Sequence, residues 1–321
     1  MSTTPRPPYD PEVAPALERI AQFIPTNVTV EMIPTMREAM AQGPTPTEQF
    51  DALGIEFRDI TFPSSDGYEV TASIYTRPGR TGTGPGIYYL HGGGMIFGDR
   101  HGGPAAFADL VRDANAVIVS VEYRLAPEHP DPAPVEDAYA GLIWTAGHLA
   151  ELGIEPDRFI IAGHSAGGGL SAGVTLLARD RKGPQVQAQM LMSPMLDDRD
   201  ATASTRQYED TGTVSRATSI TAWTGLLGDR RATGDVSSYA APARATDLTG
   251  LPPAFIDCGS AETFRDEDVA YATALWAAGT QAELHVWAGG FHGFDGFAPD
   301  ATVSQAAVAA RTTWLQRALH L

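Results

Sequence analysis

Gly163-His164-Ser165-Ala166-Gly167 is the stretch that decides the fold of this 321-residue chain. The apolar run before it, residues 159–162, predicts a strand, and helical spacing of apolar side chains after it predicts a helix over 166–182. A Gly-x-Ser-x-Gly pentapeptide between a strand and a helix is typical of a nucleophile elbow, a tight turn that exposes the serine hydroxyl. The alternative is a glycine-rich turn with a bystander serine, and the strand–helix context argues against it.

A nucleophilic serine needs a base, and the base needs an acid that orients it. In this type of fold the acid follows the serine in the chain and the histidine comes last. Glu262 lies on a loop after the predicted strand 253–258, and His292 lies on a Gly/Phe-rich loop after the predicted strand 282–287. The sequence therefore predicts Ser165, Glu262 and His292 as nucleophile, acid and base. Other carboxylates remain rivals for the acid, namely Asp257, Asp266, Asp268, Asp197 and Asp198.

A second glycine-rich motif, His91-Gly92-Gly93-Gly94, follows another predicted strand. Glycines allow backbone N–H groups to approach a ligand closely because no Cβ stands in the way. Acyl transfer builds negative charge on a carbonyl oxygen, and preorganised backbone amides stabilise that charge. We therefore expect the amides of Gly92, Gly93 and Ala166 to form an oxyanion hole.

Two other interpretations of the glycine motif are less well supported. A phosphate-binding loop would need a Gly-Lys-Ser/Thr sequence, and the only lysine of the chain, Lys182, lies elsewhere. His91 has no second histidine at metal-ligand spacing, so we expect it to hold the loop rather than a metal.

Three motifs together resemble the hormone-sensitive-lipase-like bacterial carboxylesterases of the α/β-hydrolases. In chain order they are His91 to Gly94, Glu122 to Pro130, and Gly163 to Gly168, with a weaker match at Arg265-Asp266-Glu267 and Tyr271. The resemblance covers about Ile55 to Leu321. It implies an α/β fold with a mostly parallel central sheet, flanking helices and a helical cap. It also implies a serine carboxylesterase for short- to medium-chain acyl esters, with no cofactor and no metal.

Two residues depart from the pattern of that family. His164 stands where the family usually carries aspartate, and we expect this change to affect local electrostatics only. Glu262 stands at the position of the usual triad aspartate, so the resemblance also assigns the acid to Glu262. A lactone or amide hydrolase with the same machinery remains open. A non-catalytic receptor on this fold is disfavoured because such receptors lack the histidine that is kept here as His292.

Composition limits the partners of the chain. Its net charge of −17 and isoelectric point of about 4.7 argue against nucleic acid and anionic membrane surfaces as ligands. The single cysteine, Cys258, excludes an internal disulfide and is expected to be a small core residue. No apolar run is long enough for a membrane span and no signal peptide is visible, so we expect a cytoplasmic protein. The expected partner is a small-molecule ester, and a homodimer is left open.

The pattern of elements predicts three parts. Residues 54–196 together with 249–321 form the catalytic core, residues 1–53 an N-terminal cap segment, and residues 197–248 a cap insertion. Strands 55–62 and 68–75 alternate apolar and polar residues and are expected to be antiparallel. Strands and helices then alternate, which predicts a parallel sheet with helices on both faces. The expected helices are 13–23, 34–41, 105–114, 134–150, 166–182, 220–227, 266–278 and 301–319, and the expected parallel strands are 87–90, 116–121, 159–162, 188–193, 253–258 and 282–287.

Overall fold

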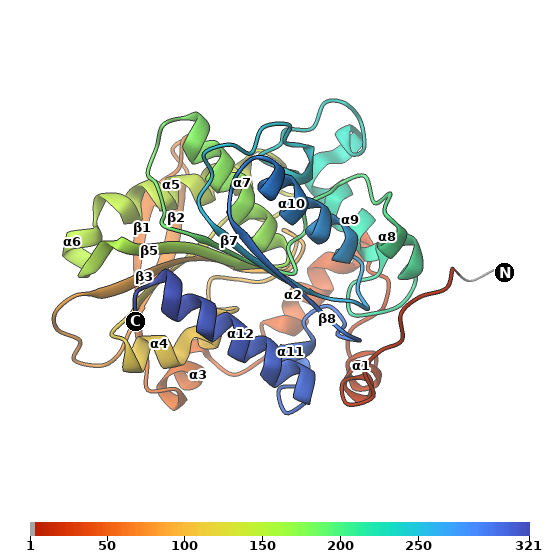
Figure 1. The fold of residues 1–321 in the computed structure, drawn as a ribbon, viewed down its shortest axis with the longest axis horizontal. Helices are drawn as coiled ribbons and strands as arrows, with labels where there is room; N and C mark the ends of the chain where they lie inside the picture. Colours follow the sequence, from red (N-terminus) through yellow and green to blue (C-terminus); the bar gives the residue numbers. More distant parts are fainter. Residues whose placement is uncertain (1–3) are drawn as a thin grey trace.

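The computed structural model describes residues 4–321 and is built around one eight-stranded sheet (Figure 1). The strands lie side by side in the order β1-β2-β4-β3-β5-β6-β7-β8. β2 is antiparallel to both of its neighbours, and every pair from β4 to β8 is parallel. The mostly parallel α/β sheet predicted from the sequence is thus confirmed. The strands are β1 (Glu56–Pro63), β2 (Glu69–Thr76), β3 (Gly84–Leu90), β4 (Val117–Glu122), β5 (Ile154–His164), β6 (Gln189–Met192), β7 (Ala254–Gly259) and β8 (Ala282–Trp287).

Helices cover both faces of the sheet. Figure 1 shows α5 (Ala133–Gly147), α7 (Ala166–Asp180) and α10 (Arg265–Ala277) on one face, with α3 (Pro46–Ala52), α4 (Ala108–Asp113) and α12 (Thr302–Ala318) on the other. The central strands β3, β6 and β7 are buried along their whole length, because a parallel strand with helices on both sides has no solvent-facing residues. The remaining helices are α1 (Ala14–Ile20), α2 (Ile33–Met40), α6 (Leu149–Leu152), α8 (Ala203–Gln207), α9 (Arg216–Leu227) and α11 (Phe294–Phe297), with 3₁₀ turns η1 (Val30–Met32), η2 (Pro104–Phe107), η3 (Gly228–Arg230) and η4 (Pro242–Arg244).

The glycines at the start of α7 allow this helix to lie very close to the ends of the central strands. A Cβ on Gly167 would stand 2.0 Å from the carbonyl oxygen of Leu90, and one on Gly169 would stand 2.0 Å from that of Met195. No side chain larger than hydrogen fits at these positions without moving the backbone. The glycines thereby fix the first turn of α7, and with it Ser165, over the carboxyl edge of the sheet.

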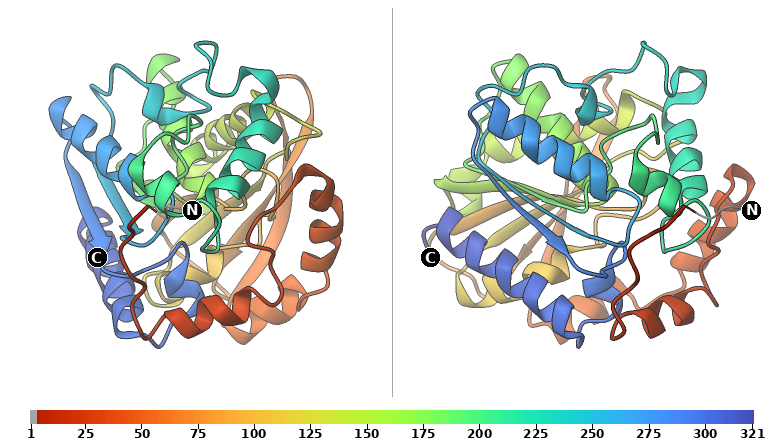
Figure 2. Two further views of the ribbon diagram at one scale, coloured as in Figure 1. Left: turned by 90° about the vertical axis from the view of Figure 1, so that its right-hand side faces the viewer. Right: turned by 45° about the vertical axis from the view of Figure 1, so that its right-hand side comes forward.

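The N-terminal stretch that leads into α2 lies against α9 near this carboxyl edge (Figure 2). The two segments are joined by hydrogen bonds: the amide of Val28 donates to Thr218 Oγ1 at 3.0 Å, and Thr221 Oγ1 donates to the carbonyl of Val28 at 2.7 Å. Ser215 Oγ also donates to Asn27 Oδ1 at 2.8 Å. Two stretches far apart in the sequence thus form one layer beside the sheet.

Some predicted elements differ in extent from the observed ones. The expected helix 134–150 is two helices, α5 and α6, and β5 begins five residues before the predicted residue 159. The short helix α3 was not predicted. Phe50 of α3 packs on Tyr75 of the sheet with ring centroids 4.6 Å apart, so this end of the segment 1–53 contacts the sheet.

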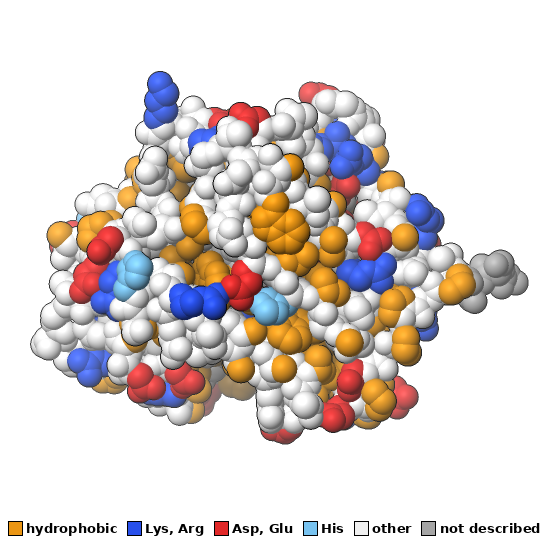
Figure 3. Space-filling view, in the orientation of Figure 1, with side chains coloured by type: hydrophobic (Ala, Val, Ile, Leu, Met, Phe, Trp, Pro, Cys, Tyr) orange, Lys and Arg blue, Asp and Glu red, His pale blue; other side chains and the backbone are white. Residues whose placement is uncertain are grey.

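The surface carries charges of both signs. On the face shown in Figure 3, acidic and basic side chains are interspersed among neutral ones and no broad basic patch is visible. Acidic residues outnumber basic ones, 39 against 22. Within residues 4–321, none of the helices has the length and apolar character needed to cross a membrane.

Candidate active site

Ser165 sits at the junction of β5 and α7, as predicted, in an unusual backbone conformation. Its φ of 58° and ψ of −123° lie in a region that L-amino acids with side chains rarely adopt. Hydrogen bonds on both sides hold the turn: the amide of Ser165 donates to Met192 O at 2.8 Å, and the amide of Met195 donates to Ser165 O at 3.0 Å. Strain of this kind, when the surroundings enforce it, is common at functional sites.

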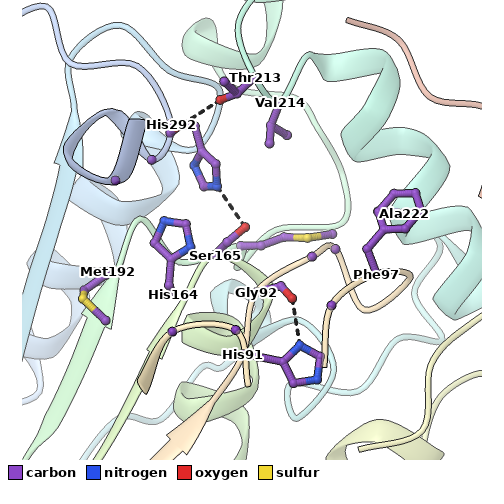
Figure 4. Close-up of a pocket in the computed structure, with 18 of the residues that line it drawn as sticks. His91, Gly92, Phe97, His164, Ser165, Met192, Thr213, Val214, Ala222 and His292 are labelled. Carbon is purple, nitrogen blue, oxygen red and sulfur yellow. Dashed lines mark hydrogen bonds between the residues drawn. The ribbon is translucent and has the colours of Figure 1, made fainter. Parts of the chain in front are cut away.

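The structure brings the three predicted residues together in one hydrogen-bonded chain, of which Figure 4 shows the link between Ser165 and His292. Ser165 Oγ lies 2.9 Å from His292 Nε2, and His292 Nδ1 lies 2.6 Å from Glu262 Oε2. All three residues are buried. With the N–H on Nδ1 donating to the carboxylate, Nε2 is free to accept the hydroxyl proton of the serine.

The loops that carry the acid and the base are tied to each other. The amide of Gly259 donates to Glu262 Oε1 at 3.0 Å, which leaves Oε2 for the histidine. The amide of Ala261 donates to Gly290 O at 3.0 Å. Thr213, from the stretch between β6 and β7, donates its hydroxyl to His292 O at 2.6 Å, a contact that sequence motifs gave no reason to expect.

Most rival carboxylates are occupied elsewhere. Asp257 accepts hydrogen bonds from Arg311 and Trp287. Three other rivals each form an ion pair with an arginine: Asp266 with Arg265, Asp197 with Arg199, and Asp198 with Arg244. Asp268 differs because it is fully buried and neither carboxylate oxygen has a hydrogen-bond partner in the described chain. Burial, followed by the nearby charge of Glu262, raises the pKa of Asp268 well above its usual range. Asp268 makes no hydrogen bond to His292, whose Nδ1 is bonded to Glu262 instead.

The glycine motif presents backbone amides near the serine. Within residues 4–321, the amides of Gly92, Gly93 and Ala166 donate no hydrogen bond, as expected for donors kept free for a ligand. Gly93 has a φ of 118°, and a Cβ there would stand 2.3 Å from Phe97 O. The amide of Ala166 is the first of α7, where the helix dipole also favours negative charge.

His91 supports this loop. Its ring stacks on Tyr123 with centroids 4.1 Å apart, and its Nδ1 lies 2.9 Å from Gly92 O. The Tyr123 hydroxyl donates to His91 O at 2.7 Å. Burial lowers the pKa of His91, so the ring is neutral. Its contacts with Tyr123 and with Gly92 O hold the backbone of the glycine motif in place.

One cluster near the site has metal-ligand chemistry. Ligand atoms of Cys258, Glu262 and Asp268 all lie within 4.8 Å of one another. Both oxygens of Glu262 are already bonded, to Gly259 and His292, so a cation there would compete with the histidine for the carboxylate. Burial raises the pKa of the Cys258 thiol well above its usual value, which agrees with its interpretation as a core residue.

A cavity of about 550 Å³ opens onto the serine. Its wall on the side of the N-terminal helices and α9 is largely apolar, formed by Ile24, Val28, Met36, Met40, Val214 and Ala222. The glycine motif, Ser165 and His292 line the same cavity (Figure 4). A mostly apolar pocket with a few converging polar groups is the usual form of a small-molecule site.

His164 also lines the cavity, and its ring centroid lies 5.1 Å from that of His292. Burial, together with the neighbouring charge of His292, lowers the pKa of His164 to about 3. The departure from the usual aspartate therefore places a neutral ring beside the base.

Comparison with known proteins identifies the family to which the chain belongs. A family model described as alpha/beta hydrolase fold matches residues 87–296. The carboxylesterase NlhH of Mycobacterium tuberculosis is 35% identical over 97% of each chain. The chain belongs to the hormone-sensitive-lipase-like carboxylesterases of the α/β-hydrolase family. By this membership it is a carboxylic ester hydrolase.

Solved structures of members of this α/β-hydrolase family match the whole chain. A bacterial heroin esterase superposes with a TM-score of 0.86 at 36% identity, covering 97% of this chain and 98% of that one. Esterase LipW of Mycobacterium marinum also has a TM-score of 0.86, at 33% identity over 100% of both chains. The resemblance that the motifs predicted is confirmed.

Proposed function

We propose that the protein hydrolyses short- to medium-chain acyl esters through an acyl-enzyme on Ser165. The hydrogen-bonded chain from Ser165 through His292 to Glu262 is the observation that carries this proposal. Ser165 Oγ forms a bond to the ester carbonyl carbon while His292 Nε2 takes its proton. Glu262 holds the ring of His292 in the required tautomer and stabilises the imidazolium.

The remaining steps use the same groups. The amides of Gly92, Gly93 and Ala166 receive the developing oxyanion, and each such donor is worth about 10²–10³ in rate. The imidazolium of His292 then protonates the leaving oxygen, and the alcohol departs. Water, deprotonated by His292, attacks the acyl-enzyme and releases the acid and Ser165.

We assign the acyl-chain preference to a cap made of residues 1–53 and 197–248 over a core of residues 54–196 and 249–321. Support comes from the cavity wall, since Met36 and Met40 on one segment and Val214 and Ala222 on the other face the serine. The family resemblance implies a preference for chains of about C4 to C8 over palmitate, and a pocket bounded in this way agrees with it.

Nitrophenyl esters from acetate to palmitate, assayed beside matched lactones and amides, test this proposal. Ester turnover with a pre-steady-state burst of nitrophenol equal to the enzyme concentration is expected, because deacylation follows a faster acylation. Hydrolysis of lactones or amides alone would replace the proposed substrate class. Absence of turnover and of fluorophosphonate labelling at Ser165 would overturn the mechanism.

A further inference from the structure

The cavity has a second end, because His164 and Met192 lie on the other side of Ser165 from Ala222 of the apolar wall (Figure 4). Strand register places its residues: His164 pairs with Met192 in the parallel ladder of β5 and β6, and Met192 pairs with Asp257 of β7. Paired residues in parallel strands point to the same face of a sheet. Asp257 is bonded to Arg311 of α12, so His164 and Met192 face the α12 side.

Tyr89 belongs to the same face. It pairs with Ala162, two residues before His164, and residues two apart in a strand point the same way. The side chains of Tyr89, His164 and Met192 all line the cavity, together with Asp295 and Arg311. The cavity thus continues from the apolar wall past Ser165 to a polar end beside α12.

Two polar side chains at this end have no partner. Within residues 4–321, neither the ring nitrogens of His164 nor the hydroxyl of Tyr89 makes a hydrogen bond; His164 is partly exposed, and Tyr89 is only 2% exposed. Both residues line the cavity, so these polar groups are available there to a ligand or to water. A neutral imidazole and a phenol each offer one donor and one acceptor.

The charged groups at this end are already paired with each other. Arg311 donates to Asp257 and to Asp295, so its single positive charge faces two carboxyl groups. Arg311 also holds the pKa of Asp295 below its usual value, against the effect of burial. The ionised carboxylate of Asp295 would repel an anionic ligand. Arg311, the cation at this end of the cavity, is already paired with the two carboxyl groups and would not attract one.

We propose that the polar end beside α12 is a subsite for a neutral hydroxyl on one arm of the ester, with His164 and Tyr89 as the specificity-determining residues. This inference rests on the proposed ester hydrolysis and adds a substrate class to it. The preferred substrate is an ester whose acyl or alcohol arm carries a hydroxyl group able to reach His164 Nδ1 or Nε2 and the Tyr89 oxygen. An arm that ends in carboxylate is disfavoured by Asp295.

Two matched substrate pairs test the proposal and separate the two arms. Ethyl hexanoate and ethyl 6-hydroxyhexanoate differ only on the acyl arm, and propyl butyrate and 3-hydroxypropyl butyrate differ only on the alcohol arm. For each pair the kcat/KM of the hydroxyl ester is divided by that of the alkyl ester. This ratio cancels any general loss of activity in a variant.

Tyr89→Phe removes one oxygen, and His164→Phe keeps an aromatic ring but removes both nitrogens. We expect each variant to lower the ratio by about two- to tenfold for one of the pairs, the range expected for one neutral hydrogen bond. Tyr68→Phe, which removes one oxygen from an exposed tyrosine outside the cavity lining, is the matched control, and its ratio is expected to stay at the wild-type value in both pairs.

An unchanged ratio in both pairs for Tyr89→Phe and His164→Phe overturns the subsite while leaving the esterase proposal intact. A fall of the same size in Tyr68→Phe also overturns it, because the effect would not be specific to the polar end. Failure of the wild type to hydrolyse any of the four esters would count instead against the proposed function. Tyr89→Phe keeps the test decisive if the histidine variant does not fold.

Discussion

At the scale of single residues, Ser165 combines an uncommon backbone conformation with a hydrogen bond to His292. Ser165→Ala keeps the backbone and removes the nucleophile, so we expect a folded protein with kcat lowered by about 10⁴–10⁶. Ester turnover and circular dichroism measured on the same sample check both parts. A fluorophosphonate probe should label the wild type at Ser165 and fail to label His292→Ala. Retention of a tenth of the wild-type activity by Ser165→Ala would remove the serine from the mechanism.

The assignment of Glu262 as the acid can be tested against a carboxylate four residues away, Asp266. Glu262→Gln keeps the size of the side chain, but the amide no longer fixes the tautomer of His292 that carries its proton on Nδ1. We therefore expect kcat to fall by about 10³–10⁴. Asp266→Asn is the matched control, because Asp266 bonds to Arg265 and to the amide of Ser204 rather than to His292. A mild effect at Glu262 with a severe one at Asp266 would show that the acid is misassigned.

The sequence contained enough information to predict the three residues of the hydrogen-bonded chain but not the other walls of the cavity. Ser165, Glu262 and His292 each follow a strand, and the carboxyl ends of parallel strands meet at one edge, so local patterns predict their proximity. Arg311 comes from a helix near the C-terminus, and only the packing of α12 on the sheet brings it to His164. No sequence motif predicts that Arg311 lies near His164, and none predicts that Tyr89 lines the cavity.

At the scale of elements, long periodic segments were predictable and short ones were not. The final helix, expected at 301–319, is α12, and Ala307 and Trp314 on its inner face are buried. The short helix α3 carries too few residues for a period, yet it had a local signal. Thr45 and Glu48 form a capping box before and within its first turn, a sequence feature that marks a helix start.

Arg37 of α2 joins the N-terminal segment to the core. Its guanidinium donates to Ile96 O at 2.8 Å, to Ala126 O at 2.7 Å and to the carboxylate of Glu128 at 2.9 Å. Arg37→Ala leaves two carbonyls without this donor, so we expect it to lower the free energy of unfolding by about 2 kcal/mol. Because α2 carries Met36 and Met40 in the cavity wall, we also expect a lower kcat/KM for hexanoate relative to acetate.

Glu128→Ala is the matched control for Arg37→Ala. It removes only the ion pair, whose carboxylate side chain is 52% exposed, and such pairs contribute less than about 1 kcal/mol. Urea denaturation and the hexanoate-to-acetate ratio of both variants separate the two contributions. Equal losses of stability in the two variants would mean that the carbonyl contacts of Arg37 contribute nothing.

At the scale of the whole molecule, the acidic composition extends into the interior. Burial raises the pKa values of Asp200, Asp257, Glu267 and Asp268 above their usual ranges. Each of these groups binds a proton more tightly in the folded chain than in the unfolded one. As pH rises through the interval between the two pKa values, each group therefore lowers the stability of the fold.

For Asp200, the loss of stability on ionisation can be expressed as a free energy. It is 1% exposed, and burial raises its pKa to about 6 even though it accepts a hydrogen bond from Ser219 and faces Arg231. Relative to an unfolded value of about 3.9, ionisation in the fold costs up to about 3 kcal/mol, nearly all of it added between pH 4 and pH 7.5. Asp200→Asn cannot ionise, so its free energy of unfolding, minus that of the wild type, should increase by about 2 kcal/mol from pH 4 to pH 7.5.

Urea denaturation at the two pH values measures this difference, and Asp66→Asn provides the control. The pKa of Asp66 is lowered by its bond to Arg124 and by the amide of Tyr68, so ionisation of this exposed group stabilises the fold, and this stabilisation develops mainly below pH 4. The difference between the wild type and Asp66→Asn should therefore change little from pH 4 to pH 7.5, whereas the stability of the wild type relative to Asp200→Asn should fall. If the difference between Asp200→Asn and the wild type is the same at pH 4 and pH 7.5, Asp200 ionises in the fold as it does in water, and burial of its carboxylate carries no cost.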